Sequence, residues 1–414
     1  MNSAREESLS TTPEEVRKQV TRWAEELKPD LLDWRRKIHQ QPELGFQERL
    51  TSALIVEKLA EFGITELRTG VGETGVIAVL PGGSPGKTVA VRADMDALPI
   101  QERAGRCYGS QIAGKMHACG HDAHVAIALG TARVLSQLQG QWPGTVKFLF
   151  QPAEEGDPGY GLSGAKRMVA EGAMDNPAPS AIYALHVMPT LDAGQFGCNE
   201  GPVWAGADHF TITILGKQTH GAYPHTGLDP IPIAAEVVTS LQTIVSRRVD
   251  PCFPTVITVG EIHGGNRDNI LAGEVQLKGT VRNLQAGGCA EIRNRIHTLV
   301  RGIAGAHGAE CRLDFRSYSS VTVNDPFLAR RAAGRLGSLA GESNVIKTLP
   351  QLGSEDFAEY LSKAPGVYFL LGVRNRSKGI QAMLHTAEFD VDEDVLPLGV
   401  QAMCLLTLDQ LFLC

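Results

Sequence analysis

The 414-residue sequence predicts an α/β fold, in which a mostly parallel sheet carries helices on both faces and a smaller α+β domain is inserted. Apolar strand-like runs alternate with helical patterns over the first 200 residues. The order of elements then becomes β-α-β-β-α-β, the ferredoxin-like arrangement, and an α/β pattern returns near residue 320. We therefore expect a split α/β domain at 1–200 and 320–414 and an inserted domain at 201–319.

The elements of the split domain are expected in the following order. Thr12, Pro13 and Glu15 have the types and spacing of a capping box that begins a first helix. Helices follow at 31–39 and 48–62, strands at 75–80 and 88–93, a helix at 121–138, and strands at 145–150 and 181–185. After the insertion come helices at 325–340 and 354–363, a strand at 367–373 and a closing helix from 393.

The inserted domain is expected to begin with a strand at 207–215 and an amphipathic helix at 229–249. Two strands, a helix and a final strand complete it, at 256–262, 269–284, 286–307 and 310–317. The strand expected at 269–284 is long and regular. The order of the elements is that of the ferredoxin-like arrangement.

Composition excludes several classes of protein. The 39 Lys and Arg residues are outnumbered by 46 Asp and Glu residues, so the net charge of −7 argues against nucleic-acid and anionic-membrane partners. Eight cysteines with no CxxC pair predict a reducing compartment. No apolar run reaches the roughly 18 residues of a membrane-spanning helix, and the N-terminal segment lacks the apolar core of a signal peptide. We expect a cytoplasmic protein.

Polar side chains with metal-binding chemistry follow the predicted strands. Asp94 and Asp96, the loop with Glu154 and Glu155, and His186 each come where a strand ends. The segment His117–His124, which contains Cys119 and His121, opens the helix after the second strand. Ligands of open α/β sheets bind beyond the carboxyl ends of the strands, so these groups are expected around one crevice. Thiolate, imidazole and carboxylate donors together indicate a borderline metal ion.

Two other interpretations compete with the metal site. Cys119 beside His121 could be a catalytic thiol, or a structural cysteine, but two glutamates and surplus histidines favour metal. Gly159, Gly161 and Gly164 match GxGxxG, a motif that binds dinucleotides only where it joins a strand directly to a helix. Here it begins eight residues past Gln151, so we expect these glycines to let the backbone fold closely past the metal loop.

Several motifs together resemble the aminoacylase/carboxypeptidase metallopeptidases. They are VRADMDALP, MHACGHDAH, QPAEEG, ALHV, GSEDF and LHT, with GKQTHGA in the inserted domain. The resemblance runs from about residue 31 to 408 and is closest to hippurate hydrolases, N-acetyl-diaminopimelate deacetylases and indole-3-acetyl-amino-acid hydrolases. It implies a zinc-peptidase-like α/β domain with a ferredoxin-like lid that often mediates dimers.

Carried over by motif, the resemblance implies five ligands for two divalent metal ions, with Cys119 shared: Cys119, His121, Glu155, His186 and His385. Manganese is favoured, and zinc, nickel or cobalt also suit these donors. Glu154 is the implied general base for a metal-bound water nucleophile, and Asp96 is expected to orient a ligand histidine. His117, Asp122 and His124 are interpreted as structural residues, and Asp94 is not counted as a ligand.

In the lid, the resemblance implies that His220 stabilises the oxyanion, commonly across the dimer. Asn269 and Arg282 fall at positions that resemble contacts to the substrate carboxylate. A homodimer or higher homo-oligomer through the lid is expected on the same ground. Thr386, Tyr223 and Trp204 depart from common family residues, which affects the expected substrate and not the reaction.

The leading hypothesis is a binuclear metal-dependent amidohydrolase that cleaves N-acyl-L-amino acids to a carboxylic acid and an amino acid. A dipeptidase or carboxypeptidase with the same site is the close alternative. The remaining hypotheses are a metal-bound binding protein without catalysis, which the presence of the base candidate and all five ligand positions disfavours, and a cysteine hydrolase. The cysteine hydrolase predicts that thiol alkylation abolishes activity while chelators do not.

Overall fold

The computed structural model describes residues 12–156 and 163–413, which fall into two units. Unit 1 contains the described residues up to 201 together with 323–348 and 359–413. Unit 2 contains 202–322 and 349–358. The sequence-based boundaries assigned 349–358 to the split domain, because nothing in the local pattern indicates that the chain returns to unit 2 there. The role of unit 2 as a lid stays a prediction.

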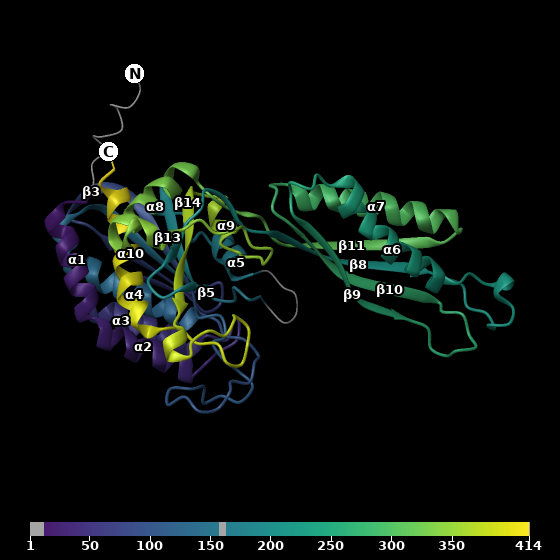
Figure 1. The fold of residues 1–414 in the computed structure, drawn as a ribbon, viewed down its shortest axis with the longest axis horizontal. Coiled ribbons are helices and arrows are strands. Elements are labelled where there is room, and N and C mark those ends of the chain that lie inside the picture. Colours follow the sequence, from purple (N-terminus) through teal and green to yellow (C-terminus); the bar gives the residue numbers. More distant parts are fainter. Residues whose placement is uncertain (1–11, 157–162, 414) are drawn as a thin grey trace, which may run out of the picture. The chain divides into compact units, whose positions relative to one another are not determined.

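Unit 1 is built on a sheet whose described strands have the order β1-β2-β4-β3-β5-β14-β6-β13 (Figure 1). β3 pairs in parallel with β4 and β5, and β5 pairs in parallel with β14. The outer pairs β1–β2 and β2–β4 are antiparallel. The strands are β1 (Glu66–Val71), β2 (Gly75–Pro81), β3 (Ser84–Asp94), β4 (Pro143–Gln151), β5 (Ala181–Asp192), β6 (Phe196–Gly197), β13 (Val345–Ile346) and β14 (Gly366–Arg374).

Helices cover both faces of this sheet, with α4 and α10 on one side of β5 and β14 and α5 and α9 on the other (Figure 1). α4 and α10 are buried along almost their whole length, as their Ala-, Leu- and Val-rich sequences require. Both pack against β3, β4 and β5. The helices are α1 (Glu14–Glu26), α2 (Lys28–Gln40), α3 (Arg49–Glu61), α4 (His121–Gln137), α5 (Gly164–Ala170), α8 (Pro326–Ala340), α9 (Ala358–Leu361) and α10 (Leu396–Leu411).

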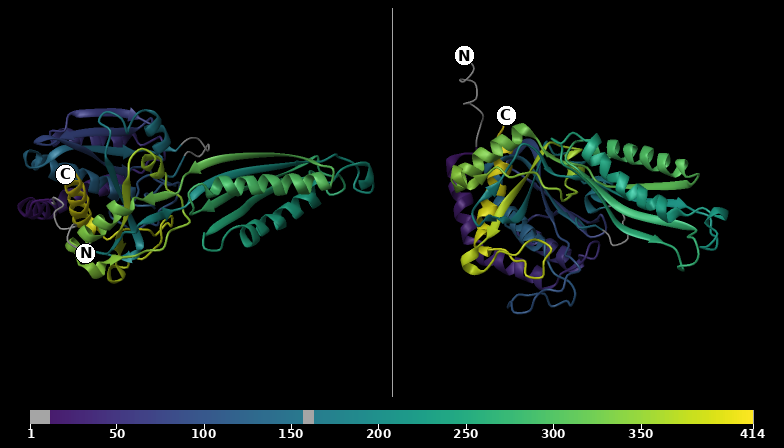
Figure 2. Two further views of the ribbon diagram at one scale, coloured as in Figure 1. Left: turned by 90° about the horizontal axis from the view of Figure 1, so that it is seen from above. Right: turned by 45° about the vertical axis from the view of Figure 1, so that its right-hand side comes forward.

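Unit 2 has the order β-α-β-β-α-β and an antiparallel sheet, β11-β8-β10-β9. Both helices lie on one face of the sheet (Figure 2), where Ile212, Leu241 and Ile296 contribute to a separate apolar core. The elements are β8 (Gly206–Leu215), α6 (Pro230–Arg248), β9 (Thr255–Gly264), β10 (Glu274–Asn283), α7 (Gly288–Ala306) and β11 (Glu310–Ser319). The short strands β7 (Gly201–Trp204) and β12 (Thr322–Asn324) form a two-stranded sheet.

Four local predictions were wrong. Thr12 does not cap α1: its hydroxyl donates to Asp409 Oδ1 at 2.6 Å, and Pro13 is the N-cap residue. β1 was missed because this edge strand is mostly polar and exposed. The strand predicted at 269–284 begins only at Glu274, and the helix predicted at 354–363 is reduced to α9. The errors at β1 and at the start of β10 lie at a sheet edge and a strand terminus, where the local pattern is weakest, whereas Glu355, Asp356 and Phe357 are buried without being helical.

The predicted fold class is confirmed: a large, mostly parallel sheet with helices is combined with a ferredoxin-like α+β unit. A search of the described helices finds none whose length and apolar character would let it span a bilayer.

Candidate metal centre

The predicted metal-binding groups of unit 1 meet at one edge of the sheet. β3 ends at Asp94, β4 ends at Gln151, and His186 lies on β5 two residues past Ala184, where the pairing of β5 with β3 ends. Because β4, β3 and β5 are parallel neighbours, their carboxyl ends share this edge. Gly120, at φ +90°, precedes α4, and a Cβ there would lie 2.3 Å from a methyl carbon of Val187. Only glycine lets α4 begin so close to β5.

All five predicted ligands come together in two groups that share Cys119. The first group is Cys119, His121 and His186, and the second is Cys119, Glu155 and His385. Within each group the candidate ligand atoms lie within 4.8 Å of one another. Cys119 Sγ is 3.4 Å from His186 Nε2, and His385 Nε2 is 2.9 Å from Glu155 Oε1. Two donors on one tetrahedral ion are separated by roughly 3.5 Å or less, so these spacings suit two cations that share a thiolate.

The donor atoms of His121 fit this interpretation. His121 Nδ1 lies 2.9 Å from the carbonyl oxygen of Asp96 and 3.2 Å from its Oδ1, so Nδ1 carries the proton. Nε2 is buried and finds no hydrogen-bond partner among the described residues. The nearest carboxylate oxygens are those of Asp94 and Glu154, at 3.7 and 3.9 Å. A buried Nε2 that faces a carboxylate-lined space is the arrangement that a metal ligand requires, once a cation displaces the proton on that nitrogen.

The electrostatics of the cluster favour cations. Burial raises the pKa of the Cys119 thiol, and the negative charges of Glu155 and Glu154 raise it further. Burial alone would lower the pKa of His121, but Asp94 and Asp96 outweigh it and raise the pKa to about 10. The metal-free cluster therefore holds protons on its sulfur and on His121. Divalent cations would displace these protons on binding.

Asp96 ties the loop that carries Glu154 and Glu155 to the start of α4. Its Oδ1 accepts the backbone N–H of Glu154 and its Oδ2 accepts that of Glu155, both at 3.0 Å. The same Oδ1 faces the Nδ1–H of His121. Asp96 therefore fixes both the orientation of a ligand ring and the backbone of the two glutamates.

Glu48 supports the same loop, and the sequence analysis missed it. Ala153 has a left-handed backbone conformation, at φ +47°, and its N–H donates to Glu48 Oε1 at 2.8 Å. Thr74 Oγ1 donates to the other carboxylate oxygen at 2.5 Å. Burial raises the pKa of Glu48 to about 7, and the charge of Asp96 adds to the effect. In the sequence Glu48 resembles any acidic residue at the start of a helix, so no local signal identifies it.

Most of the other residues near the cluster have partners away from the ligands. Asp122 Oδ2 accepts from Arg35 Nε at 2.9 Å and from His39 Nδ1 at 2.8 Å, in a buried ionic network. His117 is buried, its ring nitrogens lack hydrogen bonds to any described residue, and burial lowers its pKa to about 3.

Gly159 and Gly161 lie outside the described residues. A Cβ on Gly164 would lie 1.6 Å from the carbonyl oxygen of Pro152, so this glycine allows a close approach to the metal loop.

The predicted residues of unit 2 divide between two ends of its sheet. His220 is exposed in the loop after β8 and forms a backbone bridge to Ile270. Asn269 lies beside it, because Gly221 N–H donates to the Asn269 carbonyl at 2.7 Å. Arg282 lies near the other end of β10, roughly 26 Å from Glu274 at ~3.3 Å per residue. Its Nη1 donates to Ser354 Oγ at 2.6 Å. Within one chain the structure therefore does not bring Asn269 and Arg282 together.

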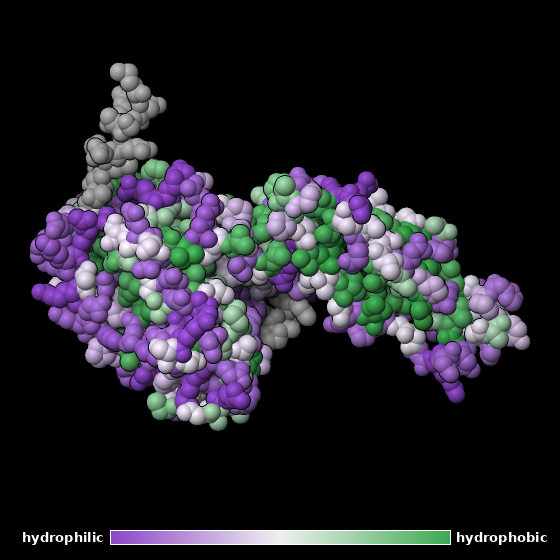
Figure 3. Space-filling model, in the orientation of Figure 1, coloured by the Kyte–Doolittle hydropathy of each residue, from purple (hydrophilic) through white to green (hydrophobic). Residues whose placement is uncertain are grey.

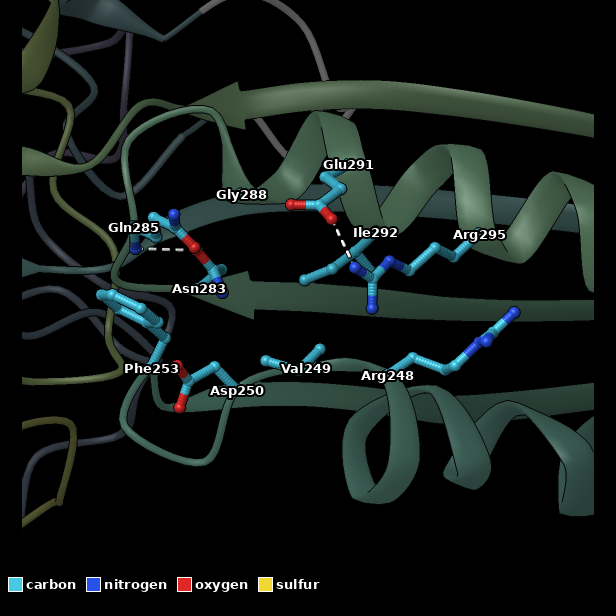
Figure 4. Close-up of a pocket in the computed structure, with 10 residues that line it drawn as sticks. All are labelled: Arg248, Val249, Asp250, Phe253, Asn283, Gln285, Gly288, Glu291, Ile292 and Arg295. Carbon is cyan, nitrogen blue, oxygen red and sulfur yellow. Dashed lines mark hydrogen bonds and ion pairs between the residues drawn. The ribbon is translucent and has the colours of Figure 1, made fainter.

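A separate cavity of about 260 Å³ lies within unit 2, between the end of α6 and the start of α7 (Figure 4). Arg248, Glu291 and Arg295 line it, and an ion pair joins the last two. None of its lining residues is a histidine or a cysteine. This cavity therefore lacks the donor set that distinguishes the carboxyl edge of the unit 1 sheet.

Comparison with known proteins agrees with this arrangement. Residues 90–409 match the model of peptidase family M20/M25/M40. Thermostable carboxypeptidase 2 of Saccharolobus solfataricus is 40% identical over 393 residues, which cover 93% of this chain and 98% of that protein. An N-acyl-L-amino acid amidohydrolase of Geobacillus stearothermophilus is 44% identical over 344 residues, 80% of this chain and 91% of that protein.

A solved structure shares this architecture. The Bacillus subtilis YXEP protein, described as a dinuclear metal-binding peptidase of the M20 family, matches with a TM-score of 0.82 and 32% identity. The match covers 94% of this chain and all of that chain. The predicted family resemblance is confirmed by these findings.

Proposed function

This chain belongs to peptidase family M20/M25/M40 and is a metal-dependent hydrolase of amide or peptide bonds, and from that premise we propose that it cleaves N-acyl-L-amino acids to a carboxylic acid and a free amino acid. The observation that carries the proposal is the pair of donor groups that share Cys119, with Glu154 next to the ligand Glu155. The similarity to an N-acyl-L-amino acid amidohydrolase supports the choice of substrate class.

Two divalent ions held by Cys119, His121, Glu155, His186 and His385 would make a water molecule more acidic and stabilise negative charge on the amide oxygen. Glu154 is the general base: its carboxylate takes the proton of the attacking water and passes it to the leaving nitrogen. Glu154 as a whole is 7% exposed, and Asp96 fixes its backbone N–H, so its position is held in a largely water-excluded site. Glu155 has the separate task of binding metal.

We favour manganese for the pair of ions. The thiolate and the imidazoles suit zinc, nickel or cobalt on ligand softness, and the carboxylates make manganese workable; the family resemblance is what favours manganese. A cytoplasmic location fits this site, since Cys119 must remain a reduced thiol to bind a cation.

His220, Asn269 and Arg282 complete the proposal. His220 and Asn269 lie together in exposed loops at the end of the unit 2 sheet farthest from residues 202 and 322, where the chain enters and leaves the unit. We propose that they act on the centre of a partner subunit in a homodimer, His220 as a donor to the oxyanion. Arg282 would bind the substrate carboxylate, since a guanidinium can bond both oxygens.

The surface of unit 2 supports self-association. β9 is an edge strand among the described strands, and Val256 and Ile262 on it are exposed. Figure 3 shows apolar surface over β9 and α6. Tyr223, Ile231 and Ile270 are also exposed near His220. Such an edge with apolar side chains is a template for pairing with another chain.

A dipeptidase or carboxypeptidase activity is the second candidate, which the similarity to a thermostable carboxypeptidase favours. It needs the same ligands and the same base, with a peptide in place of the acyl amide.

The test is amino-acid release from N-acetyl, N-benzoyl and dipeptide substrates by three samples of one preparation. The samples are the purified enzyme, the enzyme after chelation, and the chelated enzyme with manganese or zinc restored. We expect release from N-acyl-amino acids that chelation abolishes and metal restores. Turnover of dipeptides alone would favour the second candidate, and loss by thiol alkylation without loss by chelation would overturn the metal mechanism.

A further inference from the structure

We propose that His124, held by Asp94, is a positioning residue for the ligand His186 and so controls one of the two metal positions. This inference rests on the proposed metal centre, and it concerns a histidine that the sequence analysis interpreted as structural. The positioned ion is the one that Cys119, His121 and His186 would bind.

The first observation is a backbone group that the sheet leaves without a strand partner. β3 pairs with β5 only as far as Arg92 and Ala184. Farther along β5, the N–H of Val187 donates to the Nε2 of His124, at 3.0 Å. A buried N–H needs an acceptor, and a side chain of α4 supplies it where the two strands diverge.

This hydrogen bond fixes the state of the His124 ring. Because Nε2 accepts a hydrogen bond, the ring hydrogen is on Nδ1. Nδ1–H donates a hydrogen bond to Asp94 Oδ1, at 2.5 Å. The other oxygen of Asp94 accepts from Arg92 Nη1, at 2.6 Å. Asp94, His121 and His124 lie close enough to be mistaken for a third metal site, but both nitrogens of His124 are already used. His124 is therefore a support for the site and not a ligand.

Val187, the residue whose N–H His124 holds, also orients the ligand ring through its carbonyl. His186 Nδ1–H donates to the carbonyl of Val187, at 2.6 Å, which leaves Nε2 directed at Cys119 Sγ. The His124 ring packs against the His186 ring at 4.7 Å between centroids and against the His121 ring at 5.4 Å. His121 and His124 are three residues apart and share one face of α4. Loss of His124 would therefore release the N–H of Val187, the residue whose carbonyl orients His186.

The arrangement makes a selective prediction. The ion bound by Cys119, His121 and His186 depends on His124, whereas the ion bound by Cys119, Glu155 and His385 does not, because His385 and Glu155 lie on other segments. Removal of an outer partner of a metal ligand typically costs ~10–100-fold in metal affinity. We expect this loss for one of the two ions.

The experiment is a cobalt titration of metal-stripped protein, followed by the visible absorption of Co²⁺ and by metal analysis after gel filtration. His124→Phe keeps a ring against His121 and His186 but removes both hydrogen bonds. His124→Gln replaces them with one amide donor and one amide acceptor. His117→Phe is the matched control, since His117 is a buried histidine of the same segment whose nitrogens bond no described residue.

We expect the natural chain and His117→Phe each to bind two ions and to give the same cobalt spectrum. His124→Phe should keep one tight ion and bind the other ~10–100-fold more weakly, with a changed spectrum. His124→Gln should recover most of the loss. If His124→Phe binds both ions as tightly as the natural chain does, or binds both more weakly by the same factor, the proposal is overturned. If His124→Phe does not fold, failure of His124→Gln to bind better than Asp94→Asn would overturn it instead.

The outcome is separable from that of the proposed function. A natural chain that binds two cobalt ions but releases no amino acid from any acyl substrate contradicts the proposed function alone. Selective loss of one ion in His124→Phe supports the positioning role whatever the substrate is.

Discussion

The metal-binding edge of unit 1 and the far end of unit 2 hold their functional residues in opposite ways. In unit 1, Asp96 and Glu48 bond the backbone around Glu154, and the ligands Cys119, His121 and His186 are buried. In unit 2, His220 and Asn269 are exposed on loops. The comparison teaches that the buried candidate ligands of unit 1 are held in place by their surroundings, whereas the residues proposed to act on another subunit stay accessible.

The strongest way to test the division of labour inside unit 1 is to exchange its adjacent glutamates separately. We expect Glu154→Gln to lower kcat by ~10²–10⁴-fold with both ions retained, because it removes only the proton acceptor. Glu155→Gln should instead lose an ion. Metal analysis and steady-state kinetics on both variants check this. Equal metal loss in the two variants would contradict separate tasks for the two carboxylates.

Replacing His220 tests whether the two regions cooperate between subunits. His220→Ala should lower kcat by ~10²–10³-fold, the usual cost of one oxyanion donor. Subunits carrying His220→Ala and Glu154→Gln should then be mixed after reversible dissociation. If the partner's His220 serves each site, one intact site forms in each mixed dimer and about a quarter of the activity returns. Absence of any recovery in verified mixed dimers would place His220 in its own subunit's site.

Arg282 is expected to affect binding more than chemistry. Arg282→Lys keeps the charge but loses the planar fork, and it should raise KM by ~10-fold with a smaller change in kcat. Ser354→Ala, which removes only the hydrogen-bond partner of Arg282, is the matched control. KM values for acyl-amino acids and for their amides separate the roles. An equal rise for both substrates would show that Arg282 does not read the carboxylate.

Glu48 should give the smallest effect, on stability. Its pKa is about 7 in the folded chain against an ordinary value of 4.5, so the folded state holds the proton longer as pH rises. The stabilisation is complete below pH 4.5 and is lost as pH rises through 7. Relative to Glu48→Gln, the natural metal-free chain should lose about 1–3 kcal/mol of unfolding free energy between pH 4.5 and 8.

Denaturant unfolding at both pH values measures this change, and Glu61→Gln on the surface of α3 is the control. A pH dependence shared by the natural chain and Glu48→Gln would show that Glu48 ionises as an ordinary carboxyl group.

Prediction from the sequence succeeded where local pattern and burial agree. Strand ends marked the carboxyl edge, and the motif around Cys119 and His121 marked the start of α4. His385 is exposed and sits at a positive φ in a loop, so only the family resemblance pointed to it. Glu48 and His124 were missed or assigned a packing role, since their partners lie 105 and 63 residues away along the chain. Local periodicity carries no information about such pairs.

The sequence by itself determined the fold class, the order of elements and the chemical types of the metal donors, because these follow from periodicity, turn residues and spaced motifs. Only the tertiary structure decided that the two ring nitrogens of His124 bond Asp94 and Val187, and that Asn269 and Arg282 lie at different ends of β10. Hydrogen-bond direction and separation across a sheet depend on how strands are brought together, and residues distant in the chain set that geometry.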